Sequence, residues 1–323
     1  MPEPHPPLKP IPLADIQAAR ARIAGTAVRT PLVRLHSDAP SEIHLKLETL
    51  QPIGSFKLRG ALNAMRLLPA KTLAGGVYTV SAGNMAQGVA WAARELAVPC
   101  RVVAPDHTPQ TKLDAIARLG ATVVRVPFAD WWRAIVEFGV PGETGAFIHP
   151  GADPTVIAGN ATAGLEIVED LPDVDAILVP YGSGGLACGI ACAAHALRPG
   201  VRVYACEVET AAPFSASLAA GRPVAVEYTP TFVDGIGGKT VLEQIWPLAR
   251  EVLAGSIVVS VRQVADAVRM LAERTRVIAE GAGAAPVAAA LAHDLGVERV
   301  ACVVSGGNID SRKLAQILNG QVP

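Results

Sequence analysis

Residues 46–63 read KLETLQPIGSFKLRGALN, and the rest of the chain can be arranged around the lysine at position 57. An apolar segment with polar ends turns at a Gln-Pro-x-Gly sequence and enters a helix among small residues. A lysine amine is a nucleophile only when it loses its proton near neutral pH, which requires partial burial beside apolar or cationic groups. Phe56, Leu58 and Arg59 supply such neighbours for Lys57.

A lysine considered alone would be an ordinary solvated residue on the first turn of a helix. The string QPIGSFKLRGA is specific, however, and resembles the cofactor-lysine motif of fold-type II pyridoxal-phosphate (PLP) enzymes in the serine/threonine dehydratase branch. The resemblance extends from about residue 30 to residue 311. It implies that Lys57 forms a Schiff base with PLP and that Phe56 lies at the cofactor.

The overall composition indicates a large hydrophobic core and a small ligand. The chain has 323 residues, 50% of them hydrophobic, and a mean hydropathy of +0.34. This length allows two domains. The formal net charge of −1 provides no positive field for nucleic acid or an anionic membrane, so a neutral or zwitterionic small molecule fits better.

Cysteine usage and the N-terminus favour a cytoplasmic protein. The five cysteines are odd in number, stand in apolar contexts and form no CxxC pair, as expected of reduced core residues. Residues 1–13 are rich in proline and lack the apolar segment of a signal peptide, which predicts an extended arm. Two uncharged runs, residues 72–93 and 176–197, are interrupted by glycine turns, which favours buried strand–turn–helix units over membrane spans.

Strand-like and helix-like runs alternate along most of the chain. Continuous apolar strands alternating with helices are typical of a parallel, doubly wound sheet covered on both faces. A strand is expected to open at residues 30–32, and further strands are expected at residues 43–47, 77–80, 100–104, 122–126, 146–149, 176–180, 201–207 and 300–304. Helices are expected at residues 13–24, 57–68, 86–96, 111–119, 155–169, 186–197, 264–275, 284–294 and 312–318.

The pattern thus predicts an α/β fold, and the resemblance implies two doubly wound parallel-sheet domains like those of the tryptophan synthase β chain. It implies a large PLP-binding domain made of residues 1–72 and 152–323. Residues 73–151 would form a small domain carrying the substrate loop. Relatives in this family are often dimers, so a homo-oligomer is expected.

A glycine-rich turn at residues 182–185 is a candidate phosphate site. Converging glycine amides at a helix N-terminus bind anions, although a tight turn without a ligand also explains such a cluster. Gly182, Gly184 and Ala187, with Glu207 twenty residues further, also match a relaxed dinucleotide fingerprint, so NAD is an alternative. The family resemblance favours PLP phosphate bound by Gly182, Ser183, Gly184, Gly185 and Leu186.

A second glycine turn, Ser81-Ala82-Gly83-Asn84, follows another strand and precedes a helix. It resembles the family's substrate loop, which implies that residues 81–85 bind the substrate carboxylate and that Asn84 also contacts the cofactor. A capped helix is the alternative. Met85 stands where the family usually has histidine, and Ala82 where serine racemases have a second serine, which favours elimination over racemisation.

Ser305 follows the strand expected at residues 300–304, at the edge of an α/β sheet where ligands gather. In the family the matching serine meets the pyridine nitrogen of PLP, although a helix N-cap is an alternative role. A neutral hydroxyl there weakens the electron sink and favours prompt loss of a β-substituent. Glu280 and Asp234 match family positions near the cofactor, but capping or turn roles explain them as well.

A metal site is not expected. Glu207 resembles one carboxylate of the cation site in some relatives, but the second falls near Pro213, which has no ligating side chain. The seven histidines show no metal-binding spacing, and no GxSxG hydrolase motif occurs. Trp131 and Trp132 are interpreted as packing residues of the small domain, with a place at the substrate opening as the alternative for one of them.

The expected activity is that of a PLP-dependent lyase, a threonine/serine ammonia-lyase (dehydratase) of amino-acid metabolism. It would convert a β-hydroxy amino acid such as L-threonine or L-serine to a 2-oxo acid and ammonia. Alternatives on the same fold are serine racemase and hydroxyaspartate dehydratase. Alternatives of other classes are an NAD-dependent oxidoreductase and a non-catalytic amino-acid-binding module.

Overall fold

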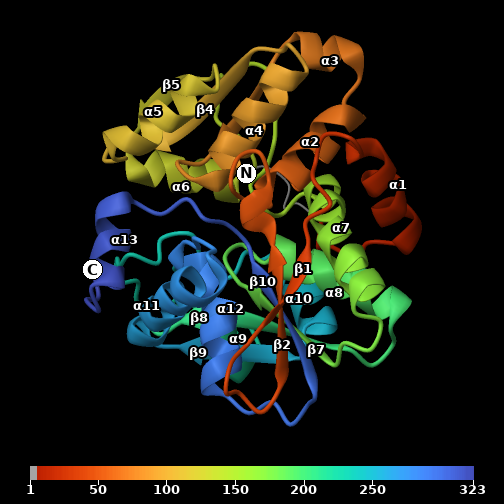
Figure 1. The fold of residues 1–323 in the computed structure, drawn as a ribbon. Helices are drawn as coiled ribbons and strands as arrows, with labels where there is room; N and C mark the ends of the chain where they lie inside the picture. The colour runs from red at the N-terminus through yellow and green to blue at the C-terminus, as the bar shows by residue number, and fades with distance from the viewer. Residues whose placement is uncertain (1–5) are drawn as a thin grey trace.

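A six-stranded sheet forms the lower part of the molecule in Figure 1, which shows a computed structural model that describes residues 6–323. The strand order is β1-β2-β10-β7-β8-β9. Only β1 and β2 pair antiparallel, and the other neighbours are parallel. The strands are β1 Leu32–Leu35, β2 Glu42–Leu47, β10 Arg299–Val304, β7 Ala176–Pro180, β8 Arg202–Val208 and β9 Gly255–Val259.

A four-stranded parallel sheet forms the upper part, with the order β5-β4-β3-β6. Its strands are β3 Val77–Val80, β4 Cys100–Pro105, β5 Thr122–Val126 and β6 Ala146–Phe147. All four come from one continuous part of the chain, whereas the larger sheet takes strands from both sides of it. The predicted α/β fold with two parallel sheets is confirmed, while the proposed domain limits stay a prediction.

Helices surround both sheets. They are α1 Leu13–Ile23, α2 Lys57–Leu67, α3 Ala70–Ala74, α4 Asn84–Glu95, α5 Gln110–Arg118, α6 Phe128–Val136, α7 Pro154–Asp170, α8 Gly185–Leu197, α9 Pro213–Ala220, α10 Trp246–Val252, α11 Val261–Met270, α12 Gly281–Ala292 and α13 Ser311–Leu318. Two single turns complete the set, a 3-10 turn at Glu48–Leu50 and a π-helical turn at Leu271–Thr275.

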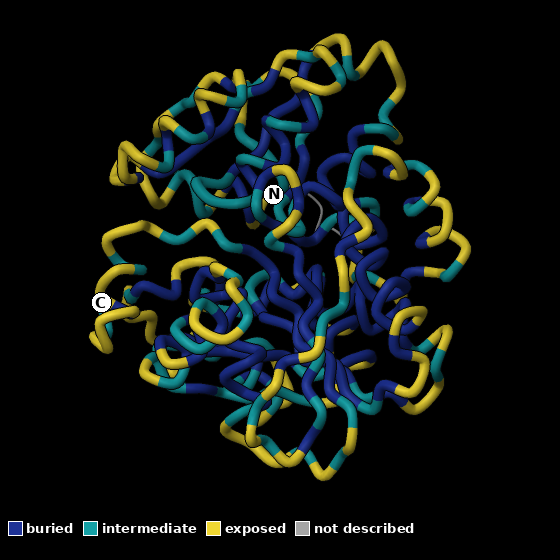
Figure 2. Tube along the Cα trace, viewed as in Figure 1, coloured by how far each residue is buried: buried dark blue, intermediate teal, exposed yellow. Residues whose placement is uncertain are grey.

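The large sheet is buried on both faces, because side chains of a strand point alternately to its two sides. In β7, Ile177 and Val179 pack into a cluster with residues of α7 and α8. Ala176 and Leu178 instead join a cluster with α11 and α12 on the opposite face. Figure 2 shows the resulting dark-blue interior beneath a largely exposed outer layer.

Helix α2 connects the two parts of the molecule, since it packs against α4 of the upper part and α7 of the lower part. Both contacts depend on glycine. A Cβ atom added at Gly88 of α4 would lie 3.1 Å from the backbone oxygen of Lys57. A Cβ atom added at Gly159 of α7 would lie 2.5 Å from the backbone oxygen of Arg59. The first turn of α2 is therefore fixed by close contacts on two sides.

A network of buried charges lies beneath this turn. Arg59 is 1% exposed and donates to Glu48 at 2.8 Å and to Glu166 at 2.7 Å. Lys46 donates to the other oxygen of Glu166 at 2.6 Å, and Thr30 donates to Glu48 at 2.6 Å. Two cations and two carboxylates thus balance one another, as buried charges require.

Several elements were not predicted from sequence: α3, α6, α9, α10 and β9. Among the predicted helices, the one expected over residues 264–275 is α-helical only to Met270 and then forms the π-helical turn before Arg276, whose φ is +61°. An extended arm was expected over residues 1–13, and positions 1–5 of it lie outside the described residues. Residues 6–12 contain no helix or strand, and Leu8 N–H donates to Gln244 O at 2.8 Å.

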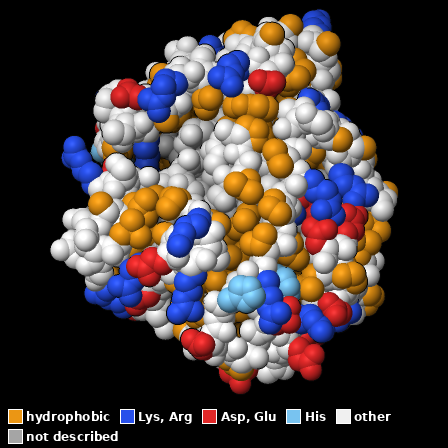
Figure 3. Space-filling model, viewed as in Figure 1, with side chains coloured by type: hydrophobic (Ala, Val, Ile, Leu, Met, Phe, Trp, Pro, Cys, Tyr) orange, Lys and Arg blue, Asp and Glu red, His pale blue; other side chains and the backbone are white. Residues whose placement is uncertain are grey.

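Charges of both signs are spread over the face of the molecule drawn in Figure 3. In the face drawn in Figure 3, Lys and Arg side chains alternate with Asp and Glu around hydrophobic patches. This matches the net charge of −1. A search of residues 6–323 for a helix apolar and long enough to cross a bilayer finds none.

Candidate active site

A cavity of about 430 Å³ lies between the two sheets. Val80 at the end of β3, Pro180 at the end of β7 and Ser305 just after β10 all line it. Carboxyl ends of parallel strands are the usual location of ligand sites in α/β proteins. The cavity brings together every residue predicted for the cofactor and substrate: Phe56, Lys57, Ser81, Ala82, Gly83, Asn84, Met85, Gly182, Ser183, Gly184, Gly185, Leu186 and Ser305.

The turn before α2 places Lys57 at the end of β10. Gly54 has a φ of +69°, which favours glycine, and its N–H closes the turn on Gln51 O at 2.7 Å. Phe56 N–H then donates to Ser305 O at 3.0 Å, and Ser55 pairs with Gly306 in an isolated β-bridge. Lys57 and Ser305 are thereby held in the same pocket although they are far apart in sequence.

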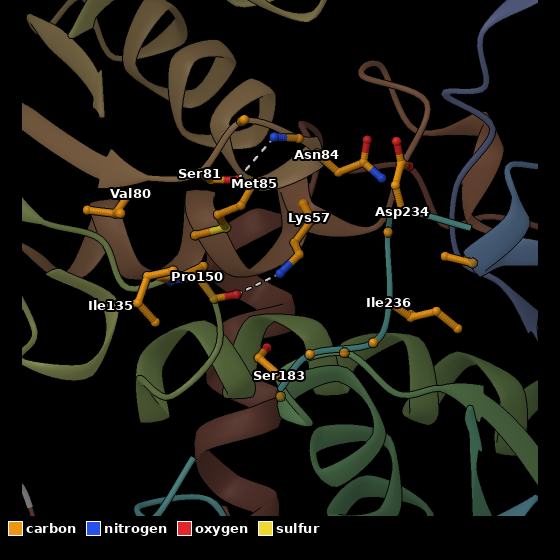
Figure 4. Close-up of a pocket in the computed structure, with 18 of the residues that line it drawn as sticks. Lys57, Val80, Ser81, Asn84, Met85, Ile135, Pro150, Ser183, Asp234 and Ile236 are labelled. Carbon is orange, nitrogen blue, oxygen red and sulfur yellow. Dashed lines mark hydrogen bonds between the residues drawn. The ribbon is translucent and has the colours of Figure 1, made fainter. Parts of the chain in front are cut away.

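The amine of Lys57 points into the pocket without a carboxylate partner (Figure 4). Its Nζ donates to the backbone oxygen of Pro150 at 2.6 Å and lies 5.3 Å from the centroid of the Phe56 ring. Burial lowers the pKa of Lys57 to about 8, because desolvation disfavours the charged ammonium. A substantial neutral fraction is therefore available for nucleophilic attack near physiological pH.

This pKa predicts how Lys57 reacts in protein freed of cofactor. Only the neutral amine is acylated, so labelling of Lys57 by acetic anhydride should rise with pH around a midpoint near pH 8. An acetyl-lysine-amide reference in the same solution should titrate near 10.5, the usual pKa of a lysine amine. Peptide mass spectrometry of both measures the difference, and coincident midpoints would contradict a buried amine.

The turn at residues 182–185 can accept a phosphate. Gly184 has a φ of +87°, and Gly185 is the first residue of α8, so unhindered backbone amides stand at the N-terminus of this helix. A Cβ at Gly185 would lie 2.5 Å from Gly151 O, so a side chain is excluded there. Amides at a helix N-terminus stabilise an anion, and together with the reactive amine of Lys57 they fit a phosphate-bearing aldehyde such as PLP.

Ser183 interlocks this turn with the segment that contacts Lys57. A Cβ at Gly151 would lie 1.8 Å from Ser183 Oγ and 2.5 Å from its Cβ, so the serine occupies the space of a side chain at position 151. Gly151 directly follows Pro150, whose carbonyl accepts the hydrogen bond from Lys57. The serine therefore positions the lysine acceptor as well as the phosphate turn.

Replacing Gly151 by alanine is expected to displace Ser183 and weaken PLP binding, measured as the dissociation constant in a fluorescence titration, by about tenfold or more, since overpacking typically costs about 1–3 kcal/mol. Adding Ser183→Gly to Gly151→Ala removes the clashing atoms and should recover most of the loss. Gly75→Ala is the control, because this glycine is exposed, has a φ of −74° and lies outside the cavity lining. If the double variant instead lost as much PLP affinity as the two single variants together, the contact between Gly151 and Ser183 would not control cofactor binding.

The substrate loop predicted at residues 81–85 is tied to the lower part of the molecule. Asn84 donates to Glu280 at 2.7 Å and accepts from Asn308 at 2.8 Å. Burial, followed by the charge of Asp234, raises the pKa of Glu280 to about 7. Met85 is 2% exposed and packs inside the pocket wall. Asn84 therefore joins the two sheets at the edge of the cavity.

Glu207, weighed for NAD or a cation, does not line this cavity. Its two oxygens accept from the N–H groups of Phe214 and Ser215, each at 2.8 Å, and Ser256 Oγ donates to it at 2.6 Å. The carboxylate thus caps the start of α9, which removes the acidic residue that the NAD alternative needs. Among residues 6–323, no group of three or more His, Cys, Asp or Glu side chains could hold a metal ion.

Sequence reasoning missed several residues of the site. The Pro150 carbonyl is a backbone acceptor with no sequence signature. Asn160 of α7 lines the cavity, and its buried Oδ1 has no partner among the described residues. Trp131 and Trp132 pack against the hydrophobic core, as expected, and both also line the cavity, which was the alternative expected for one of them. Helix α6, which carries them, was not predicted.

Comparisons with known proteins agree with this geometry. The family described as pyridoxal-phosphate dependent enzyme matches residues 23–306. The L-threonine ammonia-lyase of Thermotoga maritima is 40% identical over 316 residues, which cover 96% of this chain and 78% of that protein. The structure of threonine deaminase isoform 2 from Solanum lycopersicum, in its processed form, has a TM-score of 0.83 at 32% identity, covering 95% of this chain and 91% of that one. Maize serine racemase has a TM-score of 0.86 at 30% identity, covering 97% and 98%.

A buried lysine facing a glycine turn between two parallel sheets defines a fold-type II PLP enzyme, and the expected resemblance is confirmed. The chain belongs to the family of pyridoxal-phosphate-dependent enzymes. Its cofactor is PLP, and it is a lyase that carries out PLP-dependent β-elimination.

Proposed function

We propose that this lyase converts a β-hydroxy amino acid such as L-threonine or L-serine to a 2-oxo acid and ammonia. The observation that carries the proposal is the amine of Lys57, which has a lowered pKa and lies in one cavity with two glycine turns. When bound, PLP withdraws electrons from the α-carbon of the substrate. The threonine ammonia-lyase and dehydratase names of the relatives support the reaction type.

The chain's own groups orient the substrate. The amides of residues 81–84, at the N-terminus of α4, would bind its carboxylate, and those of residues 182–185 would bind the cofactor phosphate. Ser305 would donate to the cofactor ring nitrogen, and Asn84 would fix the orientation of the ring. Groups held in this order would place the α-carbon of the substrate near Lys57 Nζ.

Lys57 Nζ would then move the proton. Because its pKa is lowered to about 8, a substantial fraction of this amine is neutral near physiological pH, and the neutral amine can remove the α-proton. The β-hydroxyl leaves as water after gaining a proton. The resulting enamine tautomerises and hydrolyses, which yields the 2-oxo acid and ammonia.

Racemisation of serine is the second candidate, because serine racemases are among the similar structures. It requires a proton donor on the face of the substrate opposite Lys57. Ala82 stands in the substrate loop and has no hydroxyl to serve there. Elimination is therefore favoured.

We also propose the roles given above for the named site residues. Residues 1–72 and 152–323 would form a large domain and residues 73–151 a small domain, and the protein would be a cytoplasmic homodimer.

The test of function is an assay of 2-oxo acid and ammonia with L-threonine and L-serine, with chiral analysis of the remaining amino acid. Stoichiometric 2-oxo acid and ammonia support elimination. Formation of D-serine from L-serine without any 2-oxo acid would show that the protein is a racemase and would contradict the proposed elimination.

A further inference from the structure

One face of helix α6 lines the active-site cavity. Phe128, Trp131, Trp132 and Ile135 follow the spacing i, i+3, i+4 and i+7, so they form a single stripe, here called the α6 stripe. All four line the cavity that contains Lys57. Ile135 lies beside the Pro150 segment in Figure 4, whereas Phe128 is 43% exposed, so the stripe extends from the interior to the opening.

The aromatic rings of the stripe contact one another. The centroids of Phe128 and Trp131 are 5.6 Å apart in a stacked arrangement, and those of Trp131 and Trp132 are 6.5 Å apart. The buried indole Nε1 of Trp131 has no hydrogen-bond partner among residues 6–323. A continuous aromatic wall therefore faces the cavity.

The segment at residues 235–238 lines the same cavity and consists of Gly235, Ile236, Gly237 and Gly238. The next residue, Lys239, has its Nζ 6.0 Å from the centroid of the Phe128 ring, which places this segment across the opening from α6. Three of these four residues have no side chain, and the fourth, Ile236, is only 7% exposed. The segment therefore presents mainly backbone to the opening.

Charge around the cavity disfavours an acidic side chain on the substrate. Lys112 is paired with Asp234 at 2.7 Å, and His107 lies 3.3 Å from Asp106. Glu280 is a further acidic group in the lining. Besides Lys57, the described lining contains one lysine, Lys112, which is paired with Asp234, while Lys239 at the opening lies over the Phe128 ring. A second substrate carboxylate inside the cavity would therefore meet Asp234 and Glu280.

We propose that the α6 stripe is the subsite for the substrate side chain and selects β-hydroxy amino acids that carry an aromatic ring on the β-carbon. A ring stacked on Trp131 and Trp132 buries more apolar surface than the methyl group of threonine and gains an aromatic contact. The reaction removes the α-proton and the β-hydroxyl as water, and hydrolysis of the enamine then gives an aryl-substituted 2-oxo acid and ammonia. This inference rests on the proposed β-elimination.

The test compares kcat/KM of the PLP-loaded enzyme for L-threonine, L-serine, threo-3-phenylserine and 3-hydroxyaspartate, followed as 2-oxo acid. We expect phenylserine to exceed threonine by about tenfold or more, since a single methylene can contribute that much in an apolar pocket. Trp132→Ala should lower kcat/KM for phenylserine by a similar factor, and by a clearly larger factor than for threonine. Trp132→Phe should retain the preference.

The control is Val136→Ala, on the same helix but 42% exposed and outside the cavity lining, which should change neither substrate. A preference for threonine, serine or hydroxyaspartate, or an equal loss for all substrates in Trp132→Ala, would overturn the subsite. Binding of phenylalanine and alanine, followed by tryptophan fluorescence, decides the subsite independently. If phenylalanine binds more weakly than alanine, the proposed subsite is wrong. If phenylalanine binds more tightly but none of the four β-hydroxy amino acids yields a 2-oxo acid, the subsite is supported and the proposed elimination is wrong.

Discussion

Turnover is expected to fall by at least about 10²–10⁴-fold when Lys57 is replaced by alanine, because the proposed proton carrier is lost. Among the described residues, Lys57 is the only lysine that lines the cavity and is also buried with a lowered pKa, and the substitution removes this amine. Lys57→Arg should behave similarly, since guanidinium keeps its charge and is a poor nucleophile. The 2-oxo acid assay measures the loss.

A second readout separates loss of chemistry from loss of folding. Borohydride should fix PLP covalently to the wild-type protein, with the added mass on the peptide that contains residue 57, and Lys57→Ala should show no such adduct. Lys71→Ala, an exposed lysine of α3, is the control and should keep both adduct and activity. If Lys57→Ala retained turnover within tenfold of the wild type, the assignment of Lys57 would be wrong.

Arg59→Met is expected to lower the free energy of unfolding by about 3–5 kcal/mol, because it leaves buried carboxylates without their shared cation. Glu48 is fully buried and depends on Arg59 for two hydrogen bonds, each at 2.8 Å. Glu166 keeps Lys46 but loses its contacts with Arg59. Urea denaturation followed by circular dichroism measures the change.

Arg94→Met is the matched control, because Arg94 is exposed on α4 and should change stability by no more than about 0.5 kcal/mol. The double variant Glu48→Leu with Arg59→Met removes one of the stranded carboxylates and should be more stable than Arg59→Met alone. A loss below about 1 kcal/mol for the single variant would show that the network is far less important than its burial suggests.

The fold class followed from sequence because the signals were local. Strands β3, β5 and β7 have the predicted limits, since each is a short apolar run between turn residues. Helix α6 was not predicted although the apolar residues of FADWWRAIV recur at helical spacing. The helix has only 9 residues, so this period repeats little more than twice, which is a weak signal in the sequence alone.

The site was predicted from motifs, and its supporting contacts were not. Glycine turns after strands indicate anion sites, because backbone amides at helix N-termini are read from short sequence patterns. The Ser183–Gly151 interlock, the Pro150 acceptor and the Asn84–Glu280 bond join segments distant in sequence. Such pairings depend on tertiary packing, and no local spacing encodes them.

The position of β10 has a consequence for how this enzyme matures. Of the ten strands described, β10 is the last along the chain, yet it lies in the middle of its sheet between β2 and β7. A nascent polypeptide emerging from the ribosome cannot fill this gap until the nine other strands and then β10 have been synthesised. Since Phe56 is anchored to Ser305, Lys57 should capture the vitamin-derived aldehyde only after β10 has left the ribosome.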